Sequence, residues 1–281
     1  MPHPSVVSRT RDYYNSQEVL SFQRLIYNHS DHCSIGLYDG QESIHEAMYK
    51  TVEKMASLLP LNESSVVLDM GAGYGGAARY LAKTTACHVD CLNLSEGQNQ
   101  RNRELNQKQR LDSQIRVIEG SFEEIPSENE HYDVVWSQDA LLFSSDRVKM
   151  LQEVYRVMKK GGHFIFTDPM KSDDCPTEVL QPLLERIHLD SLSSFDFYRN
   201  TATTLGFEEV QMIELTEQLT QHYRRLLEEI NDNYEAFLKA CGKDYIEHQK
   251  RGLKYWVEAG EKRYLNWGIL HFRKCLDEKH H

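Results

Sequence analysis

The stretch Val66–Gly76, with the sequence VVLDMGAGYGG, decides the fold. Its first half is apolar and rich in β-branched residues, which is typical of a parallel strand buried on both faces. Its second half is rich in glycine, which permits positive φ angles and a close approach of the backbone to a ligand. A helical pattern opens at Gly76, and amides at a helix N-terminus attract a carboxylate or a phosphate. The stretch therefore predicts a strand, a turn and a helix that bind a cofactor.

The same alternation of strand and helix continues along the chain. Short apolar runs and helical patterns follow one another, with strands expected at residues 88–94, 115–118, 132–136 and 163–167 and helices at 76–83, 96–110 and 146–158. Alternating elements of this kind are typical of a doubly wound α/β sheet. In such a sheet the ligand lies at the carboxyl ends of the strands.

Both ends of the chain depart from this alternation. Amphipathic helices are expected at residues 10–25 and 42–59, and a charged helical region at 217–260 separates two strands expected at 209–215 and 266–274. We therefore expect an N-terminal helical lid over residues 1–60, a core over 61–215, a helical cap insertion over 216–262 and a final core strand within 263–275.

Composition narrows the class of partner. The 281 residues have a formal net charge of −11, which disfavours nucleic acid and anionic membranes because the field of the protein repels phosphates. No apolar run approaches the length of a membrane span, and the first residues do not resemble a signal peptide, so a cytoplasmic location is expected. The six cysteines form no C-x-x-C pair, so neither a disulfide framework nor a metal site is expected.

The glycine turn and three later segments resemble the motifs of class I S-adenosylmethionine-dependent methyltransferases. The acidic residue before the first glycine favours this family over a nicotinamide-binding one. The resemblance implies a Rossmann-like, seven-stranded and mostly parallel sheet with a helical cap, and S-adenosylmethionine as the cofactor. It implies that the cofactor is bound by Asp69, Gly71, Ala72, Gly73, Asn93, Leu94, Gln98, Gly120, Ser121, Phe122 and Ser137. Asn93 departs from the family, which usually has an acidic residue there for the ribose hydroxyls, although an amide can still accept one hydrogen bond.

A narrower resemblance extends over about residues 13–273. The strings C-L-N-L-S, W-S-Q-D-A-L-L, T-D-P-M, Q-P-L-L-E-R-I-H-L and L-N-W-G, together with the glycine turn, look like the sarcosine and dimethylglycine N-methyltransferases that make glycine betaine. The resemblance implies a small-molecule amine as the acceptor. It implies catalytic roles for Tyr14, Gln138 and Asp139.

The chemistry of amine methylation indicates which side chains to expect in the acceptor site. The reaction needs alignment and exclusion of water, aromatic faces stabilise the cationic product, and an arginine can hold a carboxylate. Arg186 and Arg199 are the candidate carboxylate ligands. The other expected substrate-binding residues are Tyr27, Phe143, Met170, Tyr198, Tyr223 and Trp267.

Two departures from the family's sequence pattern leave the general base and the acceptor amine unidentified. Phe143 stands where related enzymes have a histidine, so the proton is lost either in solvent or to Tyr14, Asp139 or His222. The run from Tyr27 to His32 also differs from the W-G-G-x-x-x-H pattern of such enzymes. A different small acceptor, such as a phosphobase, another amino acid or a natural product, therefore stays open, as does a noncatalytic subunit of the same fold. The chain is expected to be a monomer or a homodimer.

Overall fold

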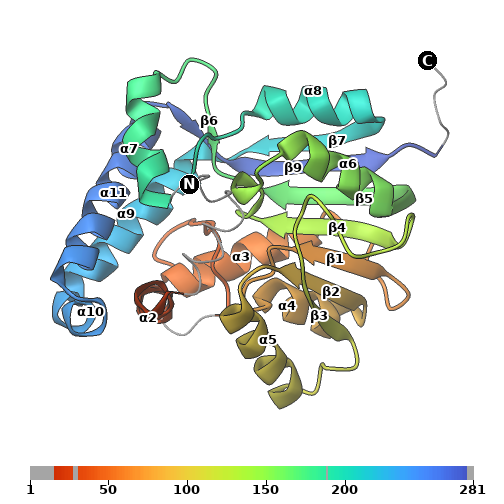
Figure 1. Cartoon of the computed structure of the whole chain (residues 1–281), viewed down its shortest axis with the longest axis horizontal. Coiled ribbons are helices and arrows are strands. Elements are labelled where there is room, and N and C mark those ends of the chain that lie inside the picture. Colours follow the sequence, from red (N-terminus) through yellow and green to blue (C-terminus); the bar gives the residue numbers. More distant parts are fainter. Residues whose placement is uncertain (1–15, 28–30, 188, 277–281) are drawn as a thin grey trace, which may run out of the picture.

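The computed structural model describes residues 16–27, 31–187 and 189–276, and its centre is a seven-stranded sheet (Figure 1). The strand order is β3-β2-β1-β4-β5-β9-β7, and only β9 runs against its neighbours. The predicted mostly parallel, seven-stranded α/β sheet is therefore confirmed. Its strands are β1 (Val66–Met70), β2 (His88–Asn93), β3 (Ile115–Glu119), β4 (Tyr132–Gln138), β5 (Met158–Thr167), β7 (Phe207–Glu214) and β9 (Gly268–Lys274).

Alternate residues of the central strands pack on opposite faces of the sheet. One face meets α3 (Ile44–Ala56) and α4 (Gly76–Thr85), and the other meets α6 (Arg147–Val157) and α8 (Phe195–Leu205). Val67 and Leu68, neighbours on β1, enter these two different clusters and are both fully buried. Burial on both faces explains why β1 reads as a continuous apolar run. The helix α5 (Glu96–Lys108) connects β2 to β3.

The strand register aligns the carboxyl ends that surround the glycine turn. Met70 at the end of β1 lies beside Leu92 of β2 on one side and Ser137 of β4 on the other. The chain leaves β1 toward β2 and returns later to β4, so the strand order reverses at this point. A doubly wound sheet opens a crevice at such a reversal.

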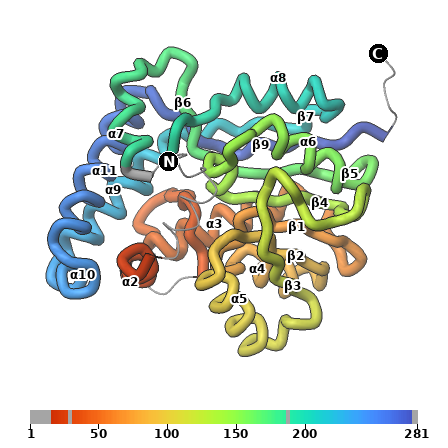
Figure 2. The backbone as a smooth tube through the Cα atoms, viewed as in Figure 1, coloured from red at the N-terminus to blue at the C-terminus, as the bar shows by residue number. Residues whose placement is uncertain are grey.

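A group of helices gathers at one end of the sheet, at the left of Figure 1. It consists of α7 (Thr177–Ile187), α9 (Thr216–Asp232), α10 (Tyr234–Cys241) and α11 (Lys243–Glu261), with α2 (Gln17–Ile26) from the start of the chain. In Figure 2 the red α2 lies beside the blue α10, and Phe22 packs against Phe237 in a tilted arrangement with ring centroids 5.6 Å apart. A short ladder of β6 (Met170–Lys171) and β8 (Leu265–Asn266) joins this group to the sheet. Segments far apart in sequence thus form one cap.

The turn after β1 depends on left-handed backbone at its glycines. Gly71 and Gly73 have φ angles of +77° and +52°. A Cβ atom on Gly71 would lie 2.3 Å from the Cβ of Ala140, whereas one on Gly73 would have no atom within 4 Å. The first glycine is therefore required by both conformation and space, and the second by conformation alone.

This difference predicts two distinct losses of stability. Gly71→Ala should lower the free energy of unfolding by about 2–4 kcal/mol, because strain and overpacking add. Gly73→Ala should cost about 1 kcal/mol, the strain of one left-handed alanine. Urea unfolding of both variants without cofactor measures the difference. Equal losses would contradict the close approach between Gly71 and Ala140.

Candidate cofactor and acceptor site

A cavity of about 120 Å³ opens beside the glycine turn, where β1, β2 and β4 end. It brings together most of the side chains expected around a cofactor and several expected around the acceptor. Of the predicted residues, those that line it are Tyr27, Gly71, Gly73, Asn93, Leu94, Gln98, Phe122, Gln138, Asp139 and Phe143. Residues from four motifs and from the end of α2 therefore meet in one place.

Asn93 presents a hydrogen-bond acceptor to this cavity. Its Nδ2 donates to Gln98 Oε1 at 3.1 Å, which leaves its Oδ1 to accept a hydrogen bond from a ligand hydroxyl. Gln98 Nε2 in turn lies 3.4 Å from Gln23 Oε1, which also accepts from the Tyr74 hydroxyl at 3.1 Å. A neutral amide network thus takes the place of the usual carboxylate.

Four lining residues were not among the sequence-based candidates: Gln23, Cys33, Ser95 and Ala140. Ser95 and Ala140 adjoin recognised motifs, so their position could have suggested them. Gln23 and Cys33 belong to the N-terminal segment, where the amphipathic pattern shows that one face is buried but not what it faces. The place of Gln23 in the site follows from the packing of α2 on the cap, and no local pattern around Cys33 indicates that it faces the cavity.

Several predicted cofactor residues shape the site without lining it. The Ser137 hydroxyl donates to the Met70 carbonyl at 2.7 Å and the Ser121 hydroxyl donates to the Glu123 carboxylate. Neither residue lines the cavity, and their predicted contact with the cofactor stays a prediction. Gly120 packs under Leu92, where a Cβ would approach to 2.8 Å, and Ala72 packs with the core behind the turn. These four residues therefore pack behind the wall of the cavity, near the carboxyl ends of the strands.

Asp69 is a buried carboxylate next to the glycine turn. No hydrogen-bond partner for its Oδ2 is present among the described residues, and burial raises the pKa of the side chain to about 7. An unpartnered buried carboxylate oxygen is costly, and a donor group on a ligand or water would satisfy it. Asp69 lines neither of the two cavities at this edge of the sheet, so its predicted contact with the cofactor stays a prediction.

Asp139 stands between the cofactor cavity and a second cavity. Its Oδ2 accepts from the Ile35 amide at 2.6 Å, and its Oδ1 accepts from Trp267 Nε1 at 2.7 Å. Its φ of +51° is strained for a residue with a side chain, and its own amide donates to the Thr167 carbonyl at 2.9 Å. Burial raises its pKa to about 6, because desolvation outweighs these hydrogen bonds.

The second cavity, of about 110 Å³, lies beyond Asp139 toward the cap. It shares Gln23, Tyr27, Cys33, Asp139 and Phe143 with the first. Aromatic rings dominate its wall, and Tyr223 packs on Trp256 with ring centroids 4.8 Å apart. The rings that line it are Phe22, Tyr27, Phe143, Tyr223 and Trp256. Electron-rich aromatic faces stabilise a cation, so this cavity suits an ammonium group.

Four predicted acceptor residues lie outside both cavities. Arg199 is partly exposed on α8, pairs with Glu209 at 2.8 Å and Asp196 at 3.1 Å, and lines neither cavity, so its role as a carboxylate ligand stays a prediction that these contacts do not support. Met170 is buried under the sheet edge in β6. Trp267 acts through its hydrogen bond to Asp139 and lines neither cavity.

Tyr198 is the fourth, and it supports the site from a distance. It is fully buried in the core, and its hydroxyl donates to Asp168 Oδ2 at 2.7 Å. Asp168 Oδ1 accepts from the Leu142 amide at 3.0 Å in the short turn Leu141–Phe143. Tyr198 therefore helps to orient the turn that presents Phe143, and its direct contact with substrate stays a prediction.

Two further candidates are not placed by the structure. Tyr14 lies outside the described residues. Arg186 belongs to α7, and its side chain lies outside the described part of the chain. Their predicted roles stay predictions.

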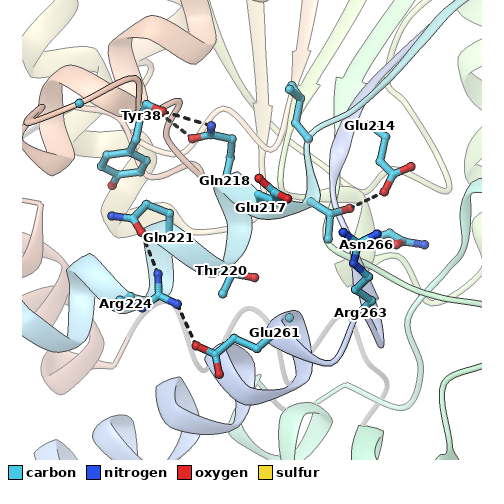
Figure 3. Close-up of a pocket in the computed structure, with 14 residues that line it drawn as sticks. Tyr38, Glu214, Glu217, Gln218, Thr220, Gln221, Arg224, Glu261, Arg263 and Asn266 are labelled. Carbon is cyan, nitrogen blue, oxygen red and sulfur yellow. Dashed lines mark hydrogen bonds and ion pairs between the residues drawn. The ribbon is translucent and has the colours of Figure 1, made fainter.

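A larger, open cavity of about 820 Å³ lies against a different face of α9 (Figure 3). Its wall is charged and hydrogen-bonded, with Arg224 donating to Glu261 and to Gln221, both at 2.8 Å. It includes none of the glycine-turn residues. Among the described residues it shares no lining residue with the second, aromatic cavity, although Tyr38 of its wall contacts His222 of that cavity at 2.8 Å. The backbone of Tyr38 is held by Gln218 in Figure 3.

The sheet order, the glycine turn and the paired cavities define a class I methyltransferase, which takes its methyl group from S-adenosylmethionine. Comparison with known proteins agrees: residues 68–166 match the methyltransferase domain family. A sarcosine/dimethylglycine N-methyltransferase of Aphanothece halophytica is 47% identical over 272 residues, which cover 96% of this chain and 98% of the relative. The chain belongs to the family of sarcosine/dimethylglycine N-methyltransferases.

Other relatives extend this comparison. An enzyme of the same description from Halorhodospira halochloris is 47% identical over 95% of this chain and 96% of its own length. A crystal structure from Galdieria sulphuraria, assigned as a sarcosine dimethylglycine methyltransferase, superposes with a TM-score of 0.88 at 36% identity and covers 94% of this chain and 100% of its own. Within the described residues, no helix is both long and apolar enough to cross a bilayer.

The hydrogen bond from Trp267 to Asp139 predicts a shift in pH dependence. The ionised carboxylate favours the positive charge that develops on the acceptor nitrogen, so activity should fall as the pH drops through the pKa of Asp139. In Trp267→Phe the carboxylate loses a donor, which should raise that pKa and move the acid limb of kcat/KM upward by about one pH unit. If the acid limb of the kcat/KM profile does not move, the group that titrates there is a different carboxylate, such as Asp69 or Asp168.

The hydrogen bond that the Asn93 side chain can accept predicts how substitutions at this position change the affinity for cofactor. Asn93→Ala should raise the dissociation constant of S-adenosylmethionine by about tenfold, since one hydrogen bond is lost at a buried site. Asn93→Asp should stay within about threefold of the wild type, because a carboxylate accepts both ribose hydroxyls while Gln98 can turn its amide to donate. Calorimetric titration measures both values. An unchanged affinity in Asn93→Ala would remove this residue from the cofactor site.

Proposed function

We propose that this enzyme methylates the amine of sarcosine, of dimethylglycine or of both, toward glycine betaine. The observation that supports this most directly is the aromatic cavity that shares Asp139 and Phe143 with the cofactor cavity. A small amine in one cavity faces a methyl donor in the other across this common wall. The names of the full-length relatives support the same acceptors.

The residues of the site match the demands of this reaction. When bound, S-adenosylmethionine supplies an electrophilic sulfonium methyl group. The acceptor nitrogen must give up its proton and offer a lone pair, and it becomes a cation as the new bond forms. Asp139 lies where it can stabilise that charge, while Tyr27 and Phe143 can cover the nitrogen and exclude water. Alignment and electrostatics are the contributions that these side chains can make.

The wall between the cavities also supports a specific assignment of residues. Gly71, Gly73, Asn93 and Gln98 are proposed to hold the cofactor, and Tyr27, Phe143 and Tyr223 to surround the acceptor. Tyr14 and Arg186 are additional candidates from the sequence. The N-terminal lid and the helices between β7 and β9 are proposed to form one cover over both ligands.

The acceptor itself can be identified by product analysis. Glycine, sarcosine, dimethylglycine and phosphoethanolamine are each incubated with enzyme and cofactor, and methylated products are detected by mass spectrometry. We expect products from sarcosine or dimethylglycine and none from phosphoethanolamine, whose phosphate has no cationic partner in the described wall. A phosphoethanolamine product with no methylated glycine would replace this proposal with a phosphobase enzyme.

The aromatic wall of the second cavity predicts that removing one ring lowers activity toward the acceptor without changing the affinity for cofactor. Tyr223→Leu should reduce kcat/KM for dimethylglycine by about tenfold, the effect of one desolvated cation–π contact. The affinity for S-adenosylmethionine should not change, because Tyr223 lines only the acceptor cavity. Tyr255→Leu, at an exposed tyrosine of α11, is the matched control and should behave as wild type. Equal effects of the two changes would refute the assignment.

A further inference from the structure

The acceptor cavity has an unexpected charge distribution. Its described lining contains no lysine and no arginine, and Asp139 is its single carboxylate. An N-methylated glycine has a carboxylate as well as an amine, so hydrogen-bond donors are required for the anionic end. Away from the wall shared with the cofactor cavity, the lining includes His222 and Trp256. Ser34 and Gln249 are also polar lining residues, and Ser34 Oγ accepts from Gln138 Nε2 at 3.3 Å. The ring nitrogens of His222 and Trp256 are the candidate donors, because the hydrogen bonds of these two rings leave one N–H of each open.

The hydrogen-bonding state of His222 is set by the backbone. The Gly36 amide donates to His222 Nδ1 at 3.3 Å, so this nitrogen must hold a lone pair. The Tyr38 hydroxyl, 2.8 Å from the same nitrogen, is then a second donor to it. Burial lowers the pKa of His222 to about 3, so the ring is neutral at physiological pH. The ring proton consequently lies on Nε2, which has no hydrogen-bond partner among the described residues.

The segment that imposes this tautomer is itself fixed. The amide of Ile35 donates to Asp139, and the amide of Leu37 donates to the Ala47 carbonyl at 2.9 Å. Tyr38 exchanges two hydrogen bonds with the Gln218 side chain, its amide donating at 2.7 Å and its carbonyl accepting at 3.2 Å (Figure 3). The Gly36 amide therefore cannot turn away, and residues 35–38 connect Asp139 to His222 at a constant spacing.

Trp256 offers a second donor in the same cavity. The residue is 1% exposed, and its Nε1 has no hydrogen-bond partner among the described residues. Buried donors without partners are rare in folded proteins and call for an explanation. A ligand acceptor in the cavity would provide one.

We propose that His222 Nε2–H and Trp256 Nε1–H receive the acceptor's carboxylate, while Asp139 and the aromatic rings face its amine. This assignment rests on the proposed function and names the residues that select an amino acid over a simple amine. Neutral donors have an advantage over a nearby arginine, because a guanidinium would repel the positive charge that develops on the nitrogen. His222 is a positioning residue in this account, since Nε2 already holds a proton and cannot accept another.

The test compares two acceptors that differ at the carboxylate. Dimethylglycine and N,N-dimethylethanolamine have the same tertiary amine, and only the first is anionic at its other end. In His222→Phe, the ratio of kcat/KM for dimethylglycine over dimethylethanolamine should fall by about tenfold to a hundredfold, through KM for dimethylglycine. His222→Gln places an amide N–H near the same point and should restore most of the ratio. Trp256→Phe keeps the ring packing and should lower the ratio by about tenfold.

Controls separate this inference from folding and from the proposed function. His88→Phe, at an exposed histidine that starts β2, should leave the ratio unchanged. The affinity of each variant for S-adenosylmethionine reports whether it is folded. If His222→Phe does not fold, the ratios measured for His222→Gln and Trp256→Phe test the inference. Binding of dimethylglycine to the complex with S-adenosylhomocysteine gives a readout without turnover and should weaken in parallel.

Each remaining outcome has a defined meaning. An unchanged ratio in both His222→Phe and Trp256→Phe would overturn the inference while leaving the N-methyltransferase assignment intact. Loss of turnover in His222→Gln at an unchanged KM would overturn it in favour of proton transfer by the imidazole. A wild-type enzyme that methylates no glycine derivative would instead refute the proposed function itself.

Discussion

The carboxylate of Asp139 is the point at which the separate parts of this molecule meet. Its side chain is half-buried in the cavity wall, and desolvation disfavours its charged form unless donors surround it. One donor is the Ile35 amide from the N-terminal segment, and the other is Trp267 Nε1 from the residue just before β9. The residue itself ends the β4 motif of the core. The lid, the sheet and the segment that follows the cap must therefore all be in place before this carboxylate is satisfied.

The topology of the sheet makes this convergence possible. The strand β9 inserts antiparallel between β5 and β7, so the chain enters it at the edge where the parallel strands end. Trp267 precedes β9 and is thus delivered to the ligand edge, with its carbonyl accepting from the Leu215 amide at 2.8 Å at the start of α9. The chain leaves the core at Leu215, just before α9, and re-enters it at Trp267, after α11. The cap is held at its base by the same strand ends that hold the site.

Much of the core could be predicted from the sequence, because its determinants are local. The turn at Gly71 needs glycine for conformation and for space, and the preceding run needs burial on both faces, so adjacent residues specify each feature. Arg199 and Tyr198 show what such local reasoning does not include. Both belong to an aromatic and basic string suited to an acceptor site, but α8 covers the far face of the sheet, where one meets Glu209 and the other meets Asp168. The side of the sheet on which a late helix packs depends on distant contacts that no short pattern records.

His222 illustrates the same limit at the level of a single proton. From the sequence it is one of three possible bases, and its neighbours on α9 give no reason to prefer a tautomer. Its state is set by Gly36, which is distant in sequence and lies in a segment that has no side-chain motif of its own. Gly36 in turn packs against α3, where a Cβ atom would come within 2.5 Å of the Cβ of Ala47. A close approach of backbone to helix therefore determines which nitrogen faces the cavity, and the electrostatics of the acceptor site follow from packing as much as from residue type.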